Sequence, residues 1–424
     1  MMDDFKQWKQ YPKYKDSGVK WLGMIPEHWE VKRLKFISNI IMGQSPNSDD
    51  YSYEEGVPFL QGNAEFGEQY PQAKIYCSTA NKYANKGNIL LSVRAPVGAL
   101  NIANQKYGIG RGLCAIKNCE TLINKDFAWY LLNVIKIGLS FLSTGSTYEA
   151  VTVDDVSNLV SVIPSLTEQK KIAQFLGKET AKIDNLINKK QHLIELLQEK
   201  RTAIISHAVT KGLNPDVPMK YSGVEWLGMI PEHWEVKRLK FISNIIMGQS
   251  PNSDDYSYEE GVPFLQGNAE FGEQYPQAKI YCSTANKYAN KGNILLSVRA
   301  PVGALNIANQ KYGIGRGLCA IKNCETLINK DFAWYLLNVI KIGLSFLSTG
   351  STYEAVTVDD VSNLVSVIPP LTEQQKIAEY LDIQTQKIDT LINKTQTSIE
   401  YLKEYRTALI SAAVTGKIDV REEI

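Results

Sequence analysis

Hydrophobic and polar residues follow two patterns along this chain of 424 residues, and each pattern occurs twice. The first consists of short apolar runs such as NILLSV, from Asn88, which is typical of a strand. Turn-forming segments separate these runs: GQSPNSDD from Gly43, EEGVP from Glu54, RAPVG from Arg94 and GIGRG from Gly108. One longer stretch, KDFAWYLLNVIKIGLSFL, has helical spacing, with apolar positions at Phe127, Tyr130, Leu131, Val134 and Ile135. This pattern predicts a mixed α and β globule.

The second pattern is an apolar stripe that advances in alternating steps of three and four residues, as on one face of a helix. Polar or charged side chains, at Thr180, Lys190 and Arg201, occupy intermediate positions. The stripe comprises Leu176, Ile183, Ile187, Ile194, Leu197, Ile204 and Ala208, and it returns as Leu381, Ile388, Ile392, Ile399, Leu402, Leu409 and Ala413.

Each stripe predicts a helix of about 40 residues, on the order of 60 Å long. Thr167 is expected to cap the first helix, and Thr372 with Gln375 to form a capping box on the second. Gly212 and Gly416 suit left-handed caps at the two carboxyl ends. Such a helix needs a partner for its stripe, and the simplest partner is the other copy, in a coiled coil within the chain. The alternative is that each stripe packs on its own globule.

The two copies are not merely similar. Residues 21–164 recur without one substitution as residues 226–369, a block of 144 residues. Beyond the block the copies have drifted: LTEQKKIAQFL from Leu166 corresponds to LTEQQKIAEYL from Leu371. Recent recombination, gene conversion and laboratory construction would each leave such an identity. The chain is therefore read as two tandem units.

Composition is that of an ordinary globular protein, with 44% hydrophobic and 21% charged residues. Apolar runs stay well below the roughly 18 to 20 residues that cross a bilayer, and MMDDFKQWKQ lacks the apolar stretch of a signal peptide, so we expect a cytoplasmic protein. The net charge is +1, so any contact with nucleic acid depends on a local patch or on a partner's charge. Buried free thiols are the favoured interpretation of the cysteines over disulfides or zinc ligands: Cys77, Cys114, Cys119, Cys282, Cys319 and Cys324.

Signatures of catalysis are missing from the sequence. It has no Walker A motif, and GIGRG lacks the strand and helix context of a dinucleotide site, so we interpret it as a turn. Neither Asn-Pro-Pro-Tyr nor Asp-Pro-Pro-Tyr, which amino-methyltransferases use, is present. The histidines, His28, His192, His207 and His233, are too few and too scattered for a metal cluster or a catalytic triad. We therefore expect no catalytic residue and no metal site in this chain.

Several segments, in this order, resemble the specificity subunit of type I restriction-modification systems. They are IMGQSP from Ile41, GVPFLQGNAEFG from Gly56, GNILLSVRAPVG from Gly87, GLCAIKN from Gly112 and GSTYEAVTVDDVSNLVSVIPSLTEQKKIAQFL from Gly145. The resemblance covers nearly the whole chain and occurs twice. It implies an α+β fold in which two globular α/β target recognition domains are separated by two long antiparallel helices, a coiled-coil spacer with pseudo-twofold symmetry. It also implies that the beginning of the chain joins its end.

On this reading the chain divides as follows: an N-terminal arm at 1–20, recognition domain 1 at 21–165, spacer helix 1 at 166–212, a linker at 213–225, the identical recognition domain 2 at 226–370, spacer helix 2 at 371–416 and a tail at 417–424. The implied partners are double-stranded DNA, two modification subunits and, through them, the ATP-dependent restriction subunits that translocate and cut DNA. The modification subunits would methylate adenine with S-adenosylmethionine, and this chain would hold no cofactor. Two identical readers related by a twofold axis would need inverted half-sites, so we expect an interrupted palindrome as the target.

Base readout requires exposed donors and acceptors, Arg for guanine and Asn or Gln for adenine, with Ser and Thr on phosphates. Arg94, between an apolar run and APVG, is the strongest candidate, and each candidate is alternatively a plain turn residue. The cluster KRLK from Lys32 fits a phosphate contact or a solvated face better than a base reader. The candidates are Gln44, Ser45, Gln61, Asn63, Arg94, Arg111, Thr144, Ser146, Thr147 and Tyr148, with repeat mates Gln249, Ser250, Gln266, Asn268, Arg299, Arg316, Thr349, Ser351, Thr352 and Tyr353.

Two other functions remain open from the residues alone. A scaffold protein could use the coiled coil to join two interaction domains without any DNA. An enzyme in its own right, such as a fused restriction and methylation polypeptide, is the second, although the chain is short for it and lacks the motifs.

Overall fold

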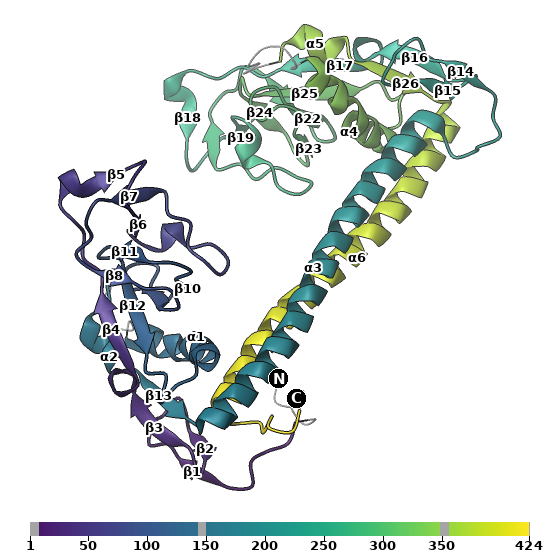
Figure 1. Ribbon diagram of the computed structural model, residues 1–424. Coiled ribbons are helices and arrows are strands. Elements are labelled where there is room, and N and C mark those ends of the chain that lie inside the picture. Colours follow the sequence, from purple (N-terminus) through teal and green to yellow (C-terminus); the bar gives the residue numbers. More distant parts are fainter. Residues whose placement is uncertain (1–7, 143–149, 348–355, 424) are drawn as a thin grey trace. The chain divides into compact units, whose positions relative to one another are not determined.

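The computed structural model describes residues 8–142, 150–347 and 356–423 (Figure 1). The chain forms two compact units. The first unit comprises Met1–Gln191 and Thr397–Ile424, and the second unit comprises His192–Gln396. Each unit therefore holds one copy of the repeated block together with half of each long helix.

Strands of the first unit build two main sheets and two short ribbons. The sheet orders are β10-β9-β12-β4 and β5-β7-β6-β11-β8, and the ribbons are β13-β3 and β1-β2. The strands are β1 Tyr14–Asp16, β2 Met24–Pro26, β3 Glu30–Arg33, β4 Ser38–Met42, β5 Tyr51–Ser52, β6 Val57–Leu60, β7 Ile75–Cys77, β8 Tyr83–Ala84, β9 Ile89–Ser92, β10 Leu100–Ile102, β11 Tyr107–Ile109, β12 Leu113–Asn118 and β13 Val160–Ile163. The helices are α1 Lys125–Leu142, α2 Val153–Ser157 and α3 Leu166–Lys211.

The second unit repeats these elements in the same sheet orders. Its strands are β14 Met219–Tyr221, β15 Met229–Pro231, β16 Glu235–Arg238, β17 Ser243–Met247, β18 Tyr256–Ser257, β19 Val262–Leu265, β20 Ile280–Cys282, β21 Tyr288–Ala289, β22 Ile294–Ser297, β23 Leu305–Ile307, β24 Tyr312–Ile314, β25 Leu318–Asn323 and β26 Val365–Ile368. Its helices are α4 Lys330–Leu347, α5 Val358–Ser362 and α6 Leu371–Val414.

The four-stranded sheet of the first unit is covered on both faces, which explains its continuous apolar runs. Side chains alternate across a strand, so Ile89 and Leu91 of β9 join the core that contains α1, whereas Leu90 joins a second core. That second core includes Leu60 and Ile109 of the five-stranded sheet. The layers are thus α1, the four-stranded sheet and the five-stranded sheet. Helix α1 spans the predicted stretch and buries Phe127, Leu131, Val134 and Ile135 as predicted.

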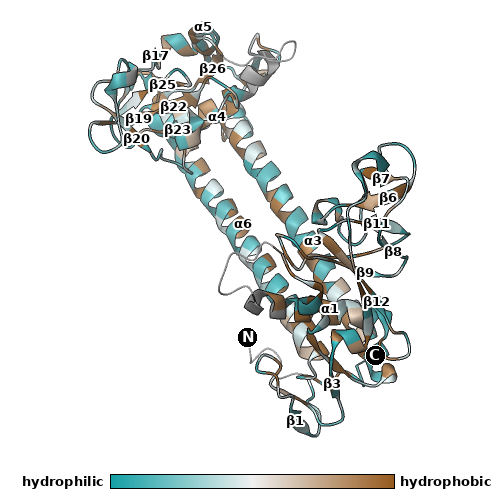
Figure 2. Ribbon diagram, turned by 90° about the vertical axis from the view of Figure 1, so that its left-hand side faces the viewer, coloured by the Kyte–Doolittle hydropathy of each residue, from teal (hydrophilic) through white to brown (hydrophobic). Residues whose placement is uncertain are grey.

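The long helices α3 and α6 have 46 and 44 residues, and in each unit their halves pack antiparallel. In the first unit Asp184 of α3 contacts Arg406 of α6. In the second unit Arg201 contacts Asp389, and Gly212 approaches Glu373. Figure 2 shows apolar residues recurring among polar ones along both helices. The predicted stripe is confirmed at Leu176, Ile183, Ile194 and Ala208 and their mates Leu381, Ile388, Ile399 and Ala413, all of which are buried.

The long helices begin at slightly different residues from those predicted. Both helices begin one residue before the threonine expected to cap them, so Thr167 and Thr372 lie in the first turn. Ser165 takes the capping role on α3, because its Oγ accepts a hydrogen bond from the Glu168 N–H at 3.3 Å. Gln375 donates to Glu379 instead of closing a capping box. At the carboxyl ends Gly212 and Gly416 have φ of 80° and 73°, as expected for left-handed caps.

The beginning and the end of the chain meet in the first unit, as the resemblance implies. The Asp419 N–H donates to the Lys9 carbonyl oxygen at 2.7 Å, and Lys9 forms an ion pair with Glu422. The Arg421 guanidinium lies 4.9 Å from the ring centroid of Tyr11. The predicted fold class, two α/β domains with a pair of antiparallel long helices, is confirmed. Within the described ranges, no helix is long and apolar enough to cross a membrane.

Candidate nucleic-acid interface

Two pairs of strands in the first unit end near one another, and within each pair the strands run in the same direction. Strands β6 and β11 pair in parallel. Strands β4 and β9 each pair antiparallel with β12, so they also share one direction. Because the carboxyl ends of strands that run together meet at one edge, the segments that follow them form a cluster of loops. The predicted residues lie on these loops: Ser45 after β4, Gln61 and Asn63 after β6, Arg94 after β9 and Arg111 after β11.

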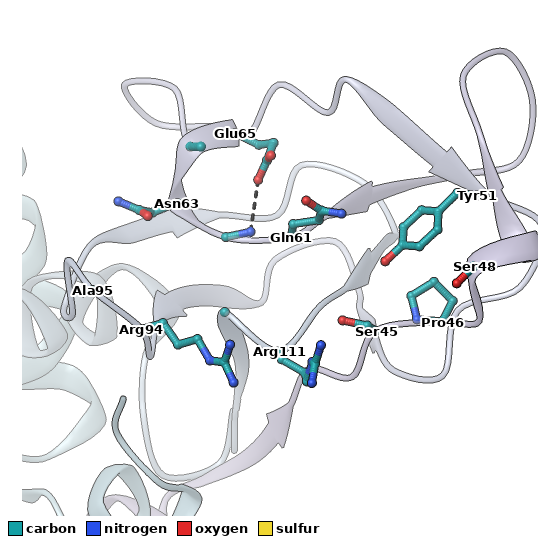
Figure 3. A pocket seen from close by; sticks show the side chains of 13 residues that line it. Ser45, Pro46, Ser48, Tyr51, Gln61, Asn63, Glu65, Arg94, Ala95 and Arg111 are labelled. Carbon is teal, nitrogen blue, oxygen red and sulfur yellow. Dashed lines mark hydrogen bonds between the residues drawn. The ribbon is translucent and has the colours of Figure 1, made fainter. Parts of the chain in front are cut away.

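These five residues line one cavity of about 560 Å³. In Figure 3, Arg94 and Arg111 project from one side of the cavity, and Gln61 and Asn63 lie opposite. Three segments that are separate in sequence thus present two guanidinium groups and two amide groups to one space. The remaining lining residues are Pro46, Ser48, Tyr51, Gly62, Ala64, Glu65, Ala95 and Gly112.

Glycines make the approach of these loops possible. A Cβ atom at Gly112 would lie 2.5 Å from the Gln61 carbonyl oxygen, and one at Gly43 would lie 2.1 Å from the Gly110 carbonyl oxygen. Only glycine allows the backbone on either side of Arg111 to rest directly on the loops that carry Gln61 and Ser45. The segment GIGRG is accordingly the end of β11 followed by the tight connection to β12.

Electrostatics favour an anionic ligand in the cavity. Both Arg94 and Arg111 are exposed, and among the described residues neither guanidinium has a hydrogen-bond or ion-pair partner. The Glu65 carboxylate is engaged elsewhere, because it accepts a hydrogen bond from the Gly62 N–H at 3.1 Å. A guanidinium can donate two hydrogen bonds to O6 and N7 of guanine or bind phosphate oxygens, and an amide can pair with adenine.

The backbone around Arg94 is held by its neighbours. Arg94 bridges Ala150 in an isolated antiparallel pair, and the Val151 N–H donates to the Val93 carbonyl oxygen at 2.7 Å. Arg94 is thereby presented from a fixed backbone.

Other predicted residues have different placements. Gln44 is exposed and anchors its loop through a backbone hydrogen bond to Ile109 at 2.9 Å, but it does not line the cavity. In the second unit the mates follow the equivalent strands: Gln249 and Ser250 after β17, Gln266 and Asn268 after β19, Arg299 after β22 and Arg316 after β24. Outside the described residues lie Thr144, Ser146, Thr147, Tyr148, Thr349, Ser351, Thr352 and Tyr353.

The basic cluster KRLK lies away from this cavity, on β3 and the short 3-10 helix that follows it. Lys32 pairs with Glu30 at 2.7 Å, and Arg33 and Lys35 both donate to the Asn158 side chain. These contacts fit a solvated face or a phosphate contact. The sequence reasoning missed Tyr51, Ser48 and Glu65 as lining residues, since their only signal was proximity to the turns that carry Ser45 and Gln61.

Possible metal ligands and thiol nucleophiles are the side chains to consider for catalysis. They contain no group of His, Cys, Asp and Glu that could hold a metal ion. Burial raises the pKa of Cys114 and of Cys319 to about 12, so these thiols are poor nucleophiles. All six cysteines are free, but Cys119 and Cys324 are exposed, which corrects the expectation that all would be buried. Their exposure follows from their place after the last strand of the four-stranded sheet, outside both cores.

The histidines of the two PEHWE segments contact glutamates of the long helices. His28 lies 3.1 Å from the buried Glu168 carboxylate, which also accepts a hydrogen bond from the Trp29 indole N–H. His233, Trp234 and Glu373 repeat the arrangement in the second unit. These contacts tie the globular part to the first turn of the long helix.

A family model matches the chain twice. The model of the type I restriction modification DNA specificity domain covers residues 26–196 and 231–401. A putative type I restriction enzyme specificity subunit of Methanocaldococcus jannaschii, MjaX, is 32% identical, over 96% of this chain and 98% of that protein. The EcoBI specificity subunit of Escherichia coli is 18% identical, over 95% of this chain and 89% of that protein.

Solved structures agree in fold. A chain from a structure of complex assembly in a type I restriction-modification system superposes with a TM-score of 0.75 at 24% identity, covering 94% of this chain and 99% of that chain. The HsdS subunit of Thermoanaerobacter tengcongensis gives a TM-score of 0.54 at 24% identity, covering 93% and 98%.

Proposed function

This chain belongs to the type I restriction-modification specificity subunits, and from that membership we propose that its two identical domains read the two halves of an interrupted palindrome in DNA. A specificity subunit gives its complex sequence-specific recognition of DNA and performs no catalysis itself. The scaffold function without DNA is therefore not favoured.

The palindrome rests on two observations. The readers are identical over 144 residues, so each recognises the same half-site. The contacts between the long helices recur with the helices exchanged: Asp184 of α3 pairs with Arg406 of α6, and Asp389 of α6 pairs with Arg201 of α3. Exchange of this kind supports the proposal of a twofold relation, under which equal half-sites would be inverted repeats.

The readout site is assigned from one observation: a single cavity is lined by Arg94, Arg111, Gln61 and Asn63. Guanidinium and amide groups are the side chains that distinguish guanine and adenine in the major groove. We assign base readout to these four and to their mates Arg299, Arg316, Gln266 and Asn268. The serines, Ser45 and Ser250, suit phosphate contacts beside them, with Gln44 and Gln249 at the margin of the same loops.

Membership in such a system implies modification and restriction subunits as partners. We propose two modification subunits, one for each unit, which methylate adenine with S-adenosylmethionine, and restriction subunits that join through them. Their site of action would be the DNA in the cytoplasm. The domain boundaries at 21–165 and 226–370, with spacer helices at 166–212 and 371–416, belong to the same proposal.

Mapping of methylated adenines by single-molecule sequencing tests the proposal in cells that express this chain with its modification subunit. A bipartite palindromic motif is expected. A bipartite but asymmetric motif would contradict the twofold argument and leave the DNA function intact. The complete absence of a motif would contradict DNA recognition itself.

A further inference from the structure

A second cavity of the first unit, of about 900 Å³, lies away from the readout loops. It opens between the start of α3, the start of α1 and three loops, at residues 69–70 between β6 and β7, 86–87 before β9 and 103–104 after β10. We call this cavity the helix cleft. Its charged lining residues are Lys86, Lys125, Lys170 and Asp126, all exposed, and Trp129, Tyr130, Gln174 and Gly177 complete its aromatic and polar wall.

Of the four residues that α3 contributes to the helix cleft, three differ between the two copies, and Ala173 is the same in both. Lys170, Gln174 and Gly177 follow one another at spacings of four and three, so they lie on one face of the helix. Their mates on α6 are Gln375, Glu379 and Asp382. The charged lining of the first unit is three lysines and one carboxylate, whereas the mates in the second unit are Lys291, Lys330, Asp331, Glu379 and Asp382. The corresponding positions therefore carry a net positive charge in the first unit and a net negative charge in the second.

The difference in lining residues changes the hydrogen bonding of Tyr130 and of its mate Tyr335. In the second unit Tyr335 donates a hydrogen bond of 2.6 Å to Asp382, and Gln375 donates to Glu379 at 2.9 Å, so the helix satisfies its own polar groups. In the first unit Tyr130 is half-buried, and its hydroxyl has no partner among the described residues. Gly177, the mate of Asp382, has no side chain that could accept this hydrogen bond. A Cβ atom at Gly177 would lie 3.8 Å from the Tyr130 hydroxyl oxygen.

The chain termini explain a different contrast between the units, the burial of Phe175. Its ring lies 5.0 Å from that of Trp8, whereas its mate Tyr380 is 38% exposed. They do not explain the difference at the helix cleft. Neither Trp8 nor any residue of the C-terminal tail lines the helix cleft. The cleft therefore differs through its own lining residues.

We propose that the helix cleft of the first unit binds an acidic segment of one modification subunit, a proposal that rests on the function proposed above. A carboxylate of this segment accepts the hydrogen bond of Tyr130. Two identical DNA readers need identical DNA contacts, so a cleft that differs between the units suits a protein partner better than the DNA backbone. Three lysines attract such a segment, and Glu379 and Asp382 repel it from the second unit. The two units thus bind their modification subunits with unequal affinity.

Isothermal titration of the purified full chain with its purified modification subunit tests this, with native mass spectrometry to count the bound copies. The wild-type chain is expected to bind two copies in two resolved steps. Conversion of the first cleft to the second, by Lys170→Gln, Gln174→Glu and Gly177→Asp together, is expected to weaken the tighter step about tenfold. The reverse triple variant, Gln375→Lys, Glu379→Gln and Asp382→Gly, is expected to strengthen the weaker step.

Gly177→Ala is the matched control, because it adds a Cβ atom at an ordinary contact distance without charge, and it should leave both steps unchanged. Equal dissociation constants in the wild type, or constants that neither triple variant moves, would overturn the proposal. A change in DNA affinity of the assembled complex without a change in partner affinity would assign the cleft to DNA and also overturn it. Failure of the wild-type chain to bind any modification subunit would instead contradict the proposed function.

Discussion

The two units contain the same 144 residues, yet the same side chain has different surroundings in each. Tyr335 is 6% exposed and bonded to Asp382, whereas Tyr130 is only half-buried beside Gly177. The readout loops show no such difference, since all the contacts that shape them come from within the identical block. Arg94 and Arg299, for example, follow the same strand in the same register.

This contrast separates two kinds of surface on one domain. The readout cavity is built from loops that contact one another, and its shape is independent of the long helices. The helix cleft is built jointly by the domain and by a helix that differs between the units. A duplicated domain can thus keep one function equal in both copies while its helices make another function unequal.

The largest expected effect comes from removing the readout arginines. Arg94→Ala alone and Arg299→Ala alone should each cost about 1 to 3 kcal/mol of DNA affinity, because each removes one bidentate contact to a base. The two losses should be equal, since the readers are identical, and should add in the double variant. Fluorescence anisotropy with labelled duplexes and the assembled complex measures all three.

Lys32→Ala provides the comparison, because Lys32 is paired with Glu30 and lies away from the cavity. It should cost less than either arginine and lose that effect at high salt. An arginine variant that weakens binding equally to target and to random duplex would show that Arg94 binds phosphate and not a base.

The next effect concerns the glycines that let the loops meet. Gly112→Ala places a Cβ atom 2.5 Å from the Gln61 carbonyl oxygen, so the backbone must shift at a cost of about 1 to 3 kcal/mol. Gly62→Ala, one loop away, meets no atom within 4 Å and has an extended φ of −163°, so it should leave the free energy of unfolding unchanged. Urea unfolding should separate the pair. Equal behaviour would mean that the loops can adjust and do not depend on this close approach.

Much of the fold could be predicted from periodicity alone. The bounds of α1 and the buried stripe of α3 are set by apolar spacing, which a sequence displays directly. The first turn of α3 was harder, because the choice between Ser165 and Thr167 as cap depends on which hydroxyl reaches the Glu168 N–H. The exposure of Cys119 was likewise hidden, since it depends on where a strand leaves the core.

The readout site could be predicted only in part. Turn residues such as Gln61, Arg94 and Arg111 were visible, but that they share one cavity follows from strand direction, which the sequence does not show. Gln44 has the same composition signal as Ser45 and yet lies outside the cavity. The helix cleft gave no signal, because the substitutions at residues 170, 174 and 177 resemble ordinary drift until the tyrosine beside them is located.

A smaller effect distinguishes the two tyrosines. Tyr335→Phe removes a hydrogen bond to a charged but exposed acceptor and should lower the free energy of unfolding by about 1 kcal/mol. Tyr130→Phe removes a hydroxyl without a partner in the described structure and should leave stability unchanged. Thermal or urea unfolding of the two variants checks this, and a larger loss for Tyr130→Phe would contradict the comparison.

The stabilisation by Tyr335 should also depend on pH. Burial, with the hydrogen bond to Asp382, raises the pKa of Tyr335 to about 12 from a usual value near 10. Only the unfolded state then loses the proton between these values, so the stabilisation is complete below about pH 10 and declines as pH rises towards 12. The difference in stability between the wild type and Tyr335→Phe should shrink over that interval.

The smallest effect concerns the ion pairs between the long helices. Asp184 accepts two hydrogen bonds from Arg406, at 2.8 and 3.2 Å, whereas its mate Asp389 accepts one from Arg201 at 3.0 Å. Both aspartates are about half exposed, at 47% and 48%, so each pair contributes less than about 1 kcal/mol. Asp184→Asn should cost slightly more than Asp389→Asn because the bidentate geometry holds the arginine more firmly. The two costs should add, since the pairs lie in different units, and both should vanish in urea unfolding at 1 M salt. A greater cost for Asp389→Asn would show that the bidentate geometry of Asp184 with Arg406 does not make that ion pair the stronger of the two.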